Sequence, residues 1–443
     1  MAKLVTFVFT VTDESGVFKE YAVSEEEFAD LDEIITSINS GVGFTCAEDE
    51  SGDLKLSSGN RGSNAHINMY YYSFIDTVTE EETEVVTELV EYQGDDGGTT
   101  GYPNDIARER IYETPYQILV EEIGEIDEED IDPEQSTDGF ILSFVRKPNN
   151  SCLDRRLYTH GEGESFKPRG RLGFSPTCRI TENIVTEIET TVIVTDILGT
   201  PEVGWLGYLN DEIILVEAYN SSTKELTFAR GMLDTVPQFH DQYSIIFFDI
   251  LDIRHSDGRS YLFGETVQAK NCPRTSQGEL PHTQANAHSV IMNARAIRPL
   301  PPGNINLKTC RHPNFITGEL GPLSWSDRDR IQQTVYYVKQ DEADIGPETD
   351  VTYELHILGE GIDVTYTSSD PEIATNSFSL TLEEEIILSS LDRPSDFFEI
   401  TLKSVRGSYD SFQSQYLEIE CAGYGMLYGD YYGVDDSCGL RVA

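Results

Sequence analysis

Short segments of alternating apolar and polar residues, each ended by turn-forming residues, constrain this chain more than any other feature. In residues 4–12, Val5, Phe7, Phe9 and Val11 share one face of an extended strand, and a turn at 13–16 leads into 17–23. These segments predict a β-hairpin. Similar strand signals recur over most of the chain, at residues 66–75, 85–92, 139–145, 211–218 and 225–230. The sequence therefore predicts a mainly β fold, with one short helix over residues 116–126.

Length and proline placement predict several domains. The chain has 443 residues, which suggests two to four domains. Prolines at 299, 301 and 302 fix φ and remove backbone donors, so residues 298–303 are expected to form a stiff inter-domain linker. The expected organisation is an acidic N-terminal β-domain (1–138), a β-rich module (139–297), the linker (298–303), a fibronectin-type-III-like β-sandwich (304–422) and a Gly/Tyr-rich C-terminal segment (423–443).

The charge of the chain narrows its partners. Asp and Glu number 79 against 31 Lys and Arg, a formal net charge of −48. Such a field repels phosphate backbones and anionic lipids, so nucleic acid is not an expected partner. A halotolerant surface and divalent-cation binding by acidic loops remain alternatives. The run 127–132 lacks the glycine and final glutamate of an EF-hand, so it predicts a solvated charge run, and no metal site is assigned.

Targeting and cysteine signals are sparse. The sequence contains no apolar run of about eighteen residues, so membrane insertion is not expected. It opens directly into a strand pattern, so we expect the protein to be synthesised and folded in a cytoplasm. The seven cysteines are scattered, with no CxxC pair, which argues against a disulfide framework or a zinc ribbon. No cofactor is predicted.

Three segments carry a resemblance to a known family. Residues 204–248 hold a Glu-Ile strand followed by Arg230-Gly231-x-x-x-Thr235-x-x-x-x-His240. Residues 294–330 lead from the prolines to Trp325, Arg328 and Arg330, and residues 423–433 are rich in Gly and Tyr. These segments resemble modules of tail-tip hub, or host-specificity, proteins of tailed bacteriophages and of related gene-transfer-agent hub proteins. The first 140 residues carry no part of the resemblance.

The resemblance implies a virion structural protein of the tail tip or baseplate, made in the host cytoplasm and contributing to tail assembly and host attachment. It also implies a homotrimer. Other tail proteins, a host cell-surface receptor and a tail fibre are its expected partners. Whether the chain is the hub itself or an accessory distal tail protein stays open.

The motif around His240 has two interpretations. In a catalytic one, His240 is a base that Asp234 orients, but no nucleophile elbow accompanies them. In the structural one, Gly231 permits a tight turn, Thr235 and Asp234 bond to its backbone, and His240 packs beneath it. The structural interpretation is preferred, so no catalytic residue is assigned and no enzymatic activity is expected.

Two further groups are candidate contacts. Trp325 is expected in the sandwich core, with Arg328 and Arg330 at the strand exit, where they stack on rings, pair with carboxylates or stand exposed. In the C-terminal segment, tyrosines offer large contact faces. The tyrosines concerned are Tyr424, Tyr428, Tyr431 and Tyr432. We expect them either to form a contact with another subunit or a partner, or to pack on the sandwich of their own chain.

Two rival functions remain. A receptor- or carbohydrate-binding adhesin, or fibre-anchoring protein, would need exposed aromatic platforms, whereas Trp205 and Trp325 both fall in expected core strands. A glycan depolymerase would need a pair of catalytic carboxylates. Acidic residues are so frequent in this chain that the sequence does not identify such a pair. The depolymerase is the least favoured.

Overall fold

The structure is a computed structural model. It describes residues 103–421 except 104, 107, 127–133, 135, 251–254, 277, 335–336, 341–343, 374 and 392, together with the backbones of seven strands before residue 94 and of a strand at 438–439. For residues 122–126 only the backbone is described. The chain forms two compact units. Unit 1 comprises residues 1–107, 148–156 and 271–286, and unit 2 comprises residues 108–147, 157–270 and 287–443.

Unit 1 contains an antiparallel sheet with the order β2-β1-β5-β6, in which β7 also pairs with β5. The predicted hairpin over residues 4–23 is confirmed, since β1 and β2 pair with Thr12 opposite Phe18. Strands β3 and β4 form a separate pair. The bounds are β1 (Lys3–Thr12), β2 (Phe18–Phe28), β3 (Phe44–Glu48), β4 (Leu54–Ser58), β5 (His66–Asp76), β6 (Glu82–Glu84) and β7 (Tyr92–Gln93).

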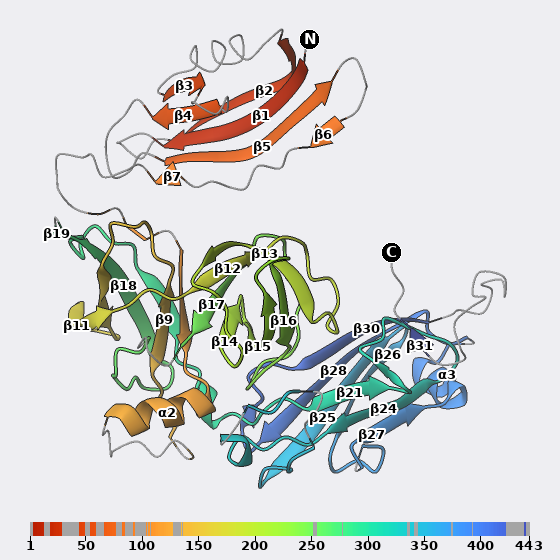
Figure 1. The fold of residues 1–443 in the computed structure, drawn as a ribbon. Coiled ribbons are helices and arrows are strands. Elements are labelled where there is room, and N and C mark those ends of the chain that lie inside the picture. The colour runs from red at the N-terminus through yellow and green to blue at the C-terminus, as the bar shows by residue number, and fades with distance from the viewer. Residues whose placement is uncertain are drawn as a thin grey trace. The chain divides into compact units, whose positions relative to one another are not determined.

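A closed barrel with the order β12-β13-β16-β15-β14-β17 is the first module of unit 2 (Figure 1). Its strands alternate, so that Val192, Val194, Ile214 and Phe228 point into one buried core. The predicted hairpin at 211–230 is confirmed, with Asn220 opposite Glu225. The bounds are β12 (Thr177–Ile180), β13 (Thr191–Leu198), β14 (Leu206–Leu209), β15 (Glu212–Asn220), β16 (Glu225–Ala229) and β17 (Ile245–Asp249).

A second set of strands includes the predicted helix. Helix α2 (Tyr116–Ile126) has the predicted bounds and buries Tyr116 and Leu119 against Phe140 and Ala296. Strands β8 (Glu109–Glu113) and β9 (Ile141–Val145) pair with each other. The neighbouring sheet has the order β11-β10-β18-β19, with β20 on β18. Its bounds are β10 (Asp154–His160), β11 (Lys167–Leu172), β18 (Thr266–Thr275), β19 (Gly278–Glu279) and β20 (His288–Ile291).

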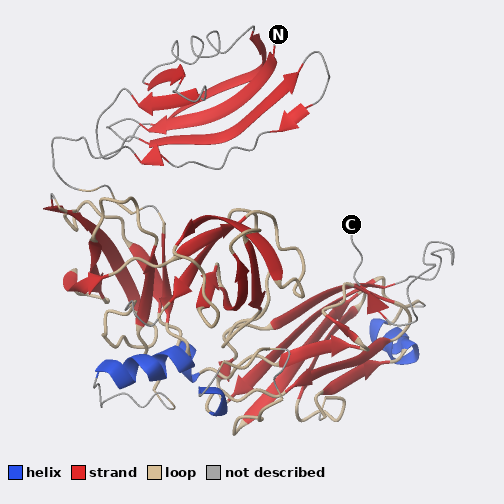
Figure 2. Ribbon diagram, viewed as in Figure 1, coloured by secondary structure: helices blue, strands red, loops and turns tan. Residues whose placement is uncertain are grey.

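The C-terminal module is a two-sheet sandwich (Figure 2). One sheet has the order β22-β21-β24-β27, and the other β26-β25-β28-β30-β23-β31 with β29 on β28. Both contribute to one core: Trp325 comes from the first sheet, and Tyr353 and Phe398 from the second. The bounds are β21 (Gly303–Leu307), β22 (Cys310–Arg311), β23 (Phe315–Ile316), β24 (Leu320–Ser326), β25 (Val351–Gly359), β26 (Ile362–Thr367), β27 (Ser377–Leu380), α3 (Leu382–Ser389), β28 (Phe397–Arg406), β29 (Tyr409–Asp410), β30 (Gln415–Cys421) and β31 (Cys438–Gly439).

The predicted fold class is confirmed: the chain is mainly β, built from several small sheets, and ends in a sandwich of the fibronectin type III kind. Short 3-10 helices η1 (Arg295–Ile297) and η2 (Gln332–Thr334) connect strands in unit 2. The predicted charge run at 127–132 lies outside the described residues. Among those that are described, no group of His, Cys, Asp and Glu is arranged to hold a metal ion. No helix in the same part of the chain is long and apolar enough to cross a membrane.

The cysteines depart from the expectation in one respect. Cys310 is disulfide-bonded, while Cys152, Cys178, Cys272 and Cys421 are free thiols. Disulfide formation depends on how close two side chains come in the fold, which the scattered spacing along the sequence does not reveal.

The proline segment is buried. No strand or helix runs through residues 298–302, since η1 ends at Ile297 and β21 begins at Gly303. However, Leu300 to Gly303 are all buried, and Gln415 Nε2 of β30 donates to the carbonyl of Pro302 at 2.8 Å. The residues on both sides of the segment belong to the same compact unit. The domain boundaries drawn from the sequence remain predictions.

This burial changes what proteolysis is expected to do. Because a protease needs an exposed, extended backbone, limited digestion of the folded protein should leave residues 298–303 intact. Mass spectrometry of the fragments checks this. Early cleavage within 298–303 would contradict the packing described here.

Candidate functional site

The carboxylate of Glu212 is the centre of the motif that the sequence singled out. Glu212 begins β15 and is fully buried. Its Oε1 accepts from Arg230 Nε at 2.7 Å and from Gly231 N at 2.9 Å. Its Oε2 accepts from Arg230 Nη2 and Gln238 N, both at 2.9 Å, and lies 2.8 Å from His240 Nε2. Five nitrogens therefore surround one carboxylate, which satisfies the lone pairs that burial would otherwise leave unpaired.

Arg230 extends this network to two loops. Its Nη1 donates to the carbonyls of Thr186 and Glu189, both at 3.0 Å, and its Nη2 donates to Gln238 O at 2.5 Å. The planar guanidinium thus joins the loop before β13 to the segment after β16. Arginine can do this because its donors form a fixed fork.

The environment of Glu212 favours the charged form. Burial acts to raise the pKa of Glu212, but the charge of Arg230 and the hydrogen bond from His240 lower it by more, so its pKa lies below the ordinary value. At neutral pH the carboxylate is ionised and paired with a guanidinium.

Gly231 and Thr235 shape the turn. Gly231 has φ +57°, and a Cβ there would come within 2.6 Å of Pro237 Cδ, so only glycine fits. Thr235 Oγ1 donates to Met232 O at 2.8 Å and accepts from Ile213 N at 3.0 Å. Both residues tie the turn to the start of β15.

Among the described residues, Asp234 neither orients His240 nor hydrogen-bonds to the turn backbone, so the role predicted for it in the turn is wrong. It pairs bidentately with Arg295, with Nε–Oδ2 2.6 Å and Nη2–Oδ1 2.7 Å, and both side chains are buried. The nearest polar neighbour of His240 on its other ring nitrogen is Asn210, with Nδ2 3.2 Å from Nδ1. The His–Asp arrangement that a catalytic interpretation requires is therefore not formed.

Arg295 links the barrel side of unit 2 to the sandwich. Its Nη1 donates to Glu113 O at 2.8 Å, and its guanidinium lies 4.1 Å from the ring centre of Phe412, which precedes β30. Gln413 makes a second link, because it accepts from Val236 N at 2.8 Å and donates to Asp211 O at 2.6 Å. We call these contacts, together with those of Arg328 and Arg330, the junction.

Trp325, Arg328 and Arg330 lie in this region. Trp325 is in the sandwich core and packs edge-on against Tyr353. Arg330 is buried, lies 2.9 Å from Glu348 Oε1, donates to Glu134 O at 3.0 Å and covers the ring of Tyr116. Arg330 is thus a paired junction residue rather than an exposed strand end.

Arg328 is buried, and no carboxylate of the described residues forms an ion pair with it. Its Nη2 donates to Gln333 Oε1 at 3.3 Å, while Nε and Nη1 have no hydrogen-bond partner among the described residues. Burial lowers the pKa of Arg328 to about 10, so it stays charged at neutral pH. A buried, unpaired cation costs stability.

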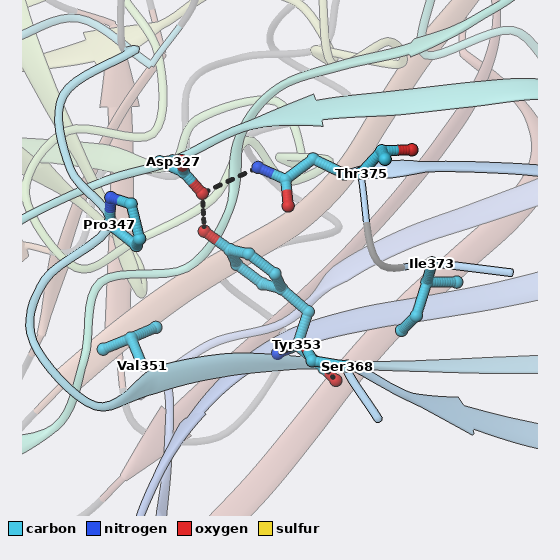
Figure 3. A pocket seen from close by; sticks show the side chains of 8 residues that line it. Asp327, Pro347, Val351, Tyr353, Ser368, Ile373 and Thr375 are labelled. Carbon is cyan, nitrogen blue, oxygen red and sulfur yellow. Dashed lines mark hydrogen bonds between the residues drawn. The ribbon is translucent and has the colours of Figure 1, made fainter. Parts of the chain in front are cut away.

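A hollow lies at one end of the sandwich (Figure 3). Its volume is about 400 Å³, and Asp327 is at its polar side. The Tyr353 hydroxyl and Asn376 Nδ2 both donate to Asp327 Oδ1, at 2.5 and 2.7 Å. These polar groups already bind one another, which leaves little free capacity for a ligand. The hollow is lined by Asp327, Pro347, Val351, Tyr353, Ser368, Ile373, Thr375 and Asn376.

The sequence found part of this site. It identified Arg230, Gly231 and His240 and noted the Glu-Ile strand before them, but it did not predict that the glutamate of this strand, Glu212, joins them. The remaining candidates, Tyr424, Tyr428, Tyr431 and Tyr432, lie outside the described residues. A glutamate at the start of a strand of buried apolar residues was the available signal, because such a carboxylate needs several donors.

Comparisons with known proteins add little. No family model and no curated protein matches the sequence. Among solved structures, the chain is similar to the FN1–FN3 domains of chicken CNTN1, with 9% identity, 95% of each chain covered and a TM-score of 0.18. A score this low carries no argument about function, and the description of the sandwich rests on its own strand order.

The first prediction from this site concerns Glu212→Gln. Loss of the charge leaves Arg230 buried and unpaired, so we expect a loss of about 3–5 kcal/mol in the free energy of unfolding at pH 7. Because the folded pKa of Glu212 is lowered, its contribution is present above the unfolded value of about 4.3 and is lost as pH falls through the folded pKa. The difference in the free energy of unfolding between wild type and Glu212→Gln should therefore be smaller at pH 3 than at pH 7.

Urea denaturation at both pH values measures this gap. Glu182→Gln is the matched control, since Glu182 is exposed and its substitution should change stability little. Equal stabilities of wild type and Glu212→Gln at pH 7 would contradict the role given to the carboxylate.

The second prediction compares two buried arginines. Arg328→Met removes an unpaired buried cation and should leave the protein as stable as before, or stabilise it by about 1–4 kcal/mol. Arg295→Met strands Asp234 and should destabilise by about 3–5 kcal/mol. Thermal unfolding followed by calorimetry distinguishes them, and equal losses for both variants would show that Arg328 has a partner.

Proposed function

We propose that the chain is a non-enzymatic structural component of a bacteriophage tail tip or baseplate, hub-like or distal, that contributes to tail assembly and host attachment. It acts as a homotrimer within the virion. Its partners are other tail proteins and a host receptor or tail fibre. The observation that carries the mechanical part of this proposal is the junction, which joins the barrel and the sandwich through buried polar contacts.

The chemistry of the buried groups supports a structural role. Glu212 accepts from backbone and side-chain donors on every side, and Asp234 is held by both arms of Arg295. Groups bonded in this way resist proton transfer, because a general base needs a free lone pair near its substrate. They add rigidity instead.

The resembling segments also support the proposal. Residues 204–248 supply β14 to β17 and the turn motif, and residues 294–330 supply η1, the proline segment and Arg330. Two of the three segments thus contribute directly to the hydrogen-bond network around Glu212 and to the junction. A rigid tandem module can transmit force and present loops at a fixed spacing.

A carbohydrate-binding adhesin is the second candidate. The hollow beside Asp327 favours it, because about 400 Å³ falls within the range of small-ligand sites. Ser368 and Asn376 on its wall are polar, but each is already hydrogen-bonded, to Tyr353 N and to Asp327 Oδ1, so a sugar hydroxyl would have to replace these bonds. Binding of a glycan that Asn376→Ala abolishes would favour this candidate.

The third prediction tests the structural proposal. Light scattering at micromolar concentration should give three times the chain mass of 49.7 kDa, and mass spectrometry of purified virions should detect the chain. Incubation with capsular or cell-wall polysaccharide should release no fragments. A clean monomer together with absence from virions would contradict the proposal, and polysaccharide cleavage would replace it with the depolymerase.

A further inference from the structure

Helix α3 turns its apolar side outward. Glu385 and Ser389 are buried on one face, four residues apart. Ile387 and Leu388 are 69% and 40% exposed. Residue 387 is two positions from both buried residues, which places it on the opposite face of the helix. Leu391, two residues after the helix, and Phe397, the first residue of β28, are also exposed, at 38% and 37%. We call Ile387, Leu388, Leu391 and Phe397 the α3 face.

Polar contacts hold the helix in this orientation. Thr381 and Glu384 form a capping box at its start. Glu385 Oε1 accepts the backbone N–H of Ser395 in the loop before β28. Ser389 Oγ accepts from Leu391 N at 3.2 Å. No apolar side chain of α3 belongs to the sandwich core or packs against it among the described residues. The outward orientation is therefore built into the local structure.

An exposed apolar helix face needs a cover, since apolar side chains gain free energy when water is removed from them. The described chain leaves β30 at Cys421, whose N–H donates to Asp396 O at 2.9 Å. Asp396 lies between Ser395, which contacts α3, and Phe397 of the α3 face. Burial raises the pKa of Cys421, and the charges of Glu385 and Asp396 raise it further.

The chain also returns to this place. Ile316 of β23 pairs with Cys421 on one side and with Cys438 of β31 on the other. Cys421 and Cys438, the described residues on either side of 422–437, therefore both pair with β23, and β31 lies at the end of the sandwich that carries α3 (Figure 1). At about 3.4 Å per residue a segment of this length reaches roughly 25 Å out and back.

The sequence of residues 422–437 suits an apolar surface. It contains Met426, Leu427 and the tyrosines at 424, 428, 431 and 432, spaced by glycines. Tyrosine and methionine supply contact area that adapts to an irregular face. Glycines allow close approach.

We propose that the α3 face is the docking site for residues 422–437 of the same chain. A tethered segment has a high effective concentration at a face beside its own ends. A second copy is disfavoured there, because the chain carries a net charge of −48 and Glu383 and Glu384 flank the face. This inference concerns only the C-terminal module and does not depend on the proposed function.

Hydrogen exchange of the full chain tests the docking. In the double substitution Ile387→Gln and Leu388→Gln, amides of residues 422–437 should exchange roughly tenfold faster. In Met426→Ser with Leu427→Ser, amides of α3 should exchange faster. When both pairs are combined, the fall in Tm should not exceed the larger of the two separate falls, because the same contact is lost in each.

Val203→Gln is the matched control: Val203 is 71% exposed in the barrel module and should change neither region. All substituted α3 side chains are exposed, so folding is not at stake. Unchanged exchange of 422–437 in the α3 variant would overturn the proposal. If sedimentation then showed that wild type associates and the α3 variant does not, the face would instead bind a second copy.

Discussion

The ionised carboxylate of Glu212 is the interaction on which the rest of unit 2 depends. Burying a charge costs several kcal/mol unless donors replace the lost water. Arg230, His240 and the backbone of Gly231 and Gln238 provide those donors. The requirement to satisfy one carboxylate therefore fixes the path of the turn after β16. The same turn places Asp234 against Arg295, which is the first contact of the junction.

The junction explains why four consecutive hydrophobic or proline residues, Pro299 to Pro302, lie buried between two modules. Arg298 Nη1 donates to Asp410 O, and Gln415 donates to Pro302 O, so the proline segment packs on the sandwich. Arg330 and Arg406 both contact Glu348. A proline-rich connection is stiff in isolation, and here its contacts with the sandwich reinforce that stiffness. Relative motion of barrel and sandwich would break the hydrogen bonds of Gln413 with Val236 and Asp211 and the contact of Arg295 with Phe412.

Local sequence patterns predicted the local structure well, but they did not predict contacts between residues that are distant in sequence. Alternation gave the hairpin of β15 and β16, and helical spacing gave α2 with its bounds. The prolines correctly marked an interruption, but the packing of Pro302 involves Gln415 of β30, which lies 113 residues later. In the segment from Arg230 to His240, the spacing of the glycine and the histidine predicted the turn. The partner of Asp234 was not foreseeable, because Arg295 is distant in sequence and reaches it only once η1 has packed.

Rigidity of the junction is the central claim, and a distance between the two modules tests it most directly. Spin labels at Ser222, in the exposed β15–β16 turn, and at Ser369, in the exposed turn after β26, report on barrel and sandwich separately. Pulsed electron paramagnetic resonance should give one narrow distance distribution in wild type and a broad one in Arg295→Met. A broad distribution in wild type would contradict the account, because it would mean that the buried contacts do not hold the modules together.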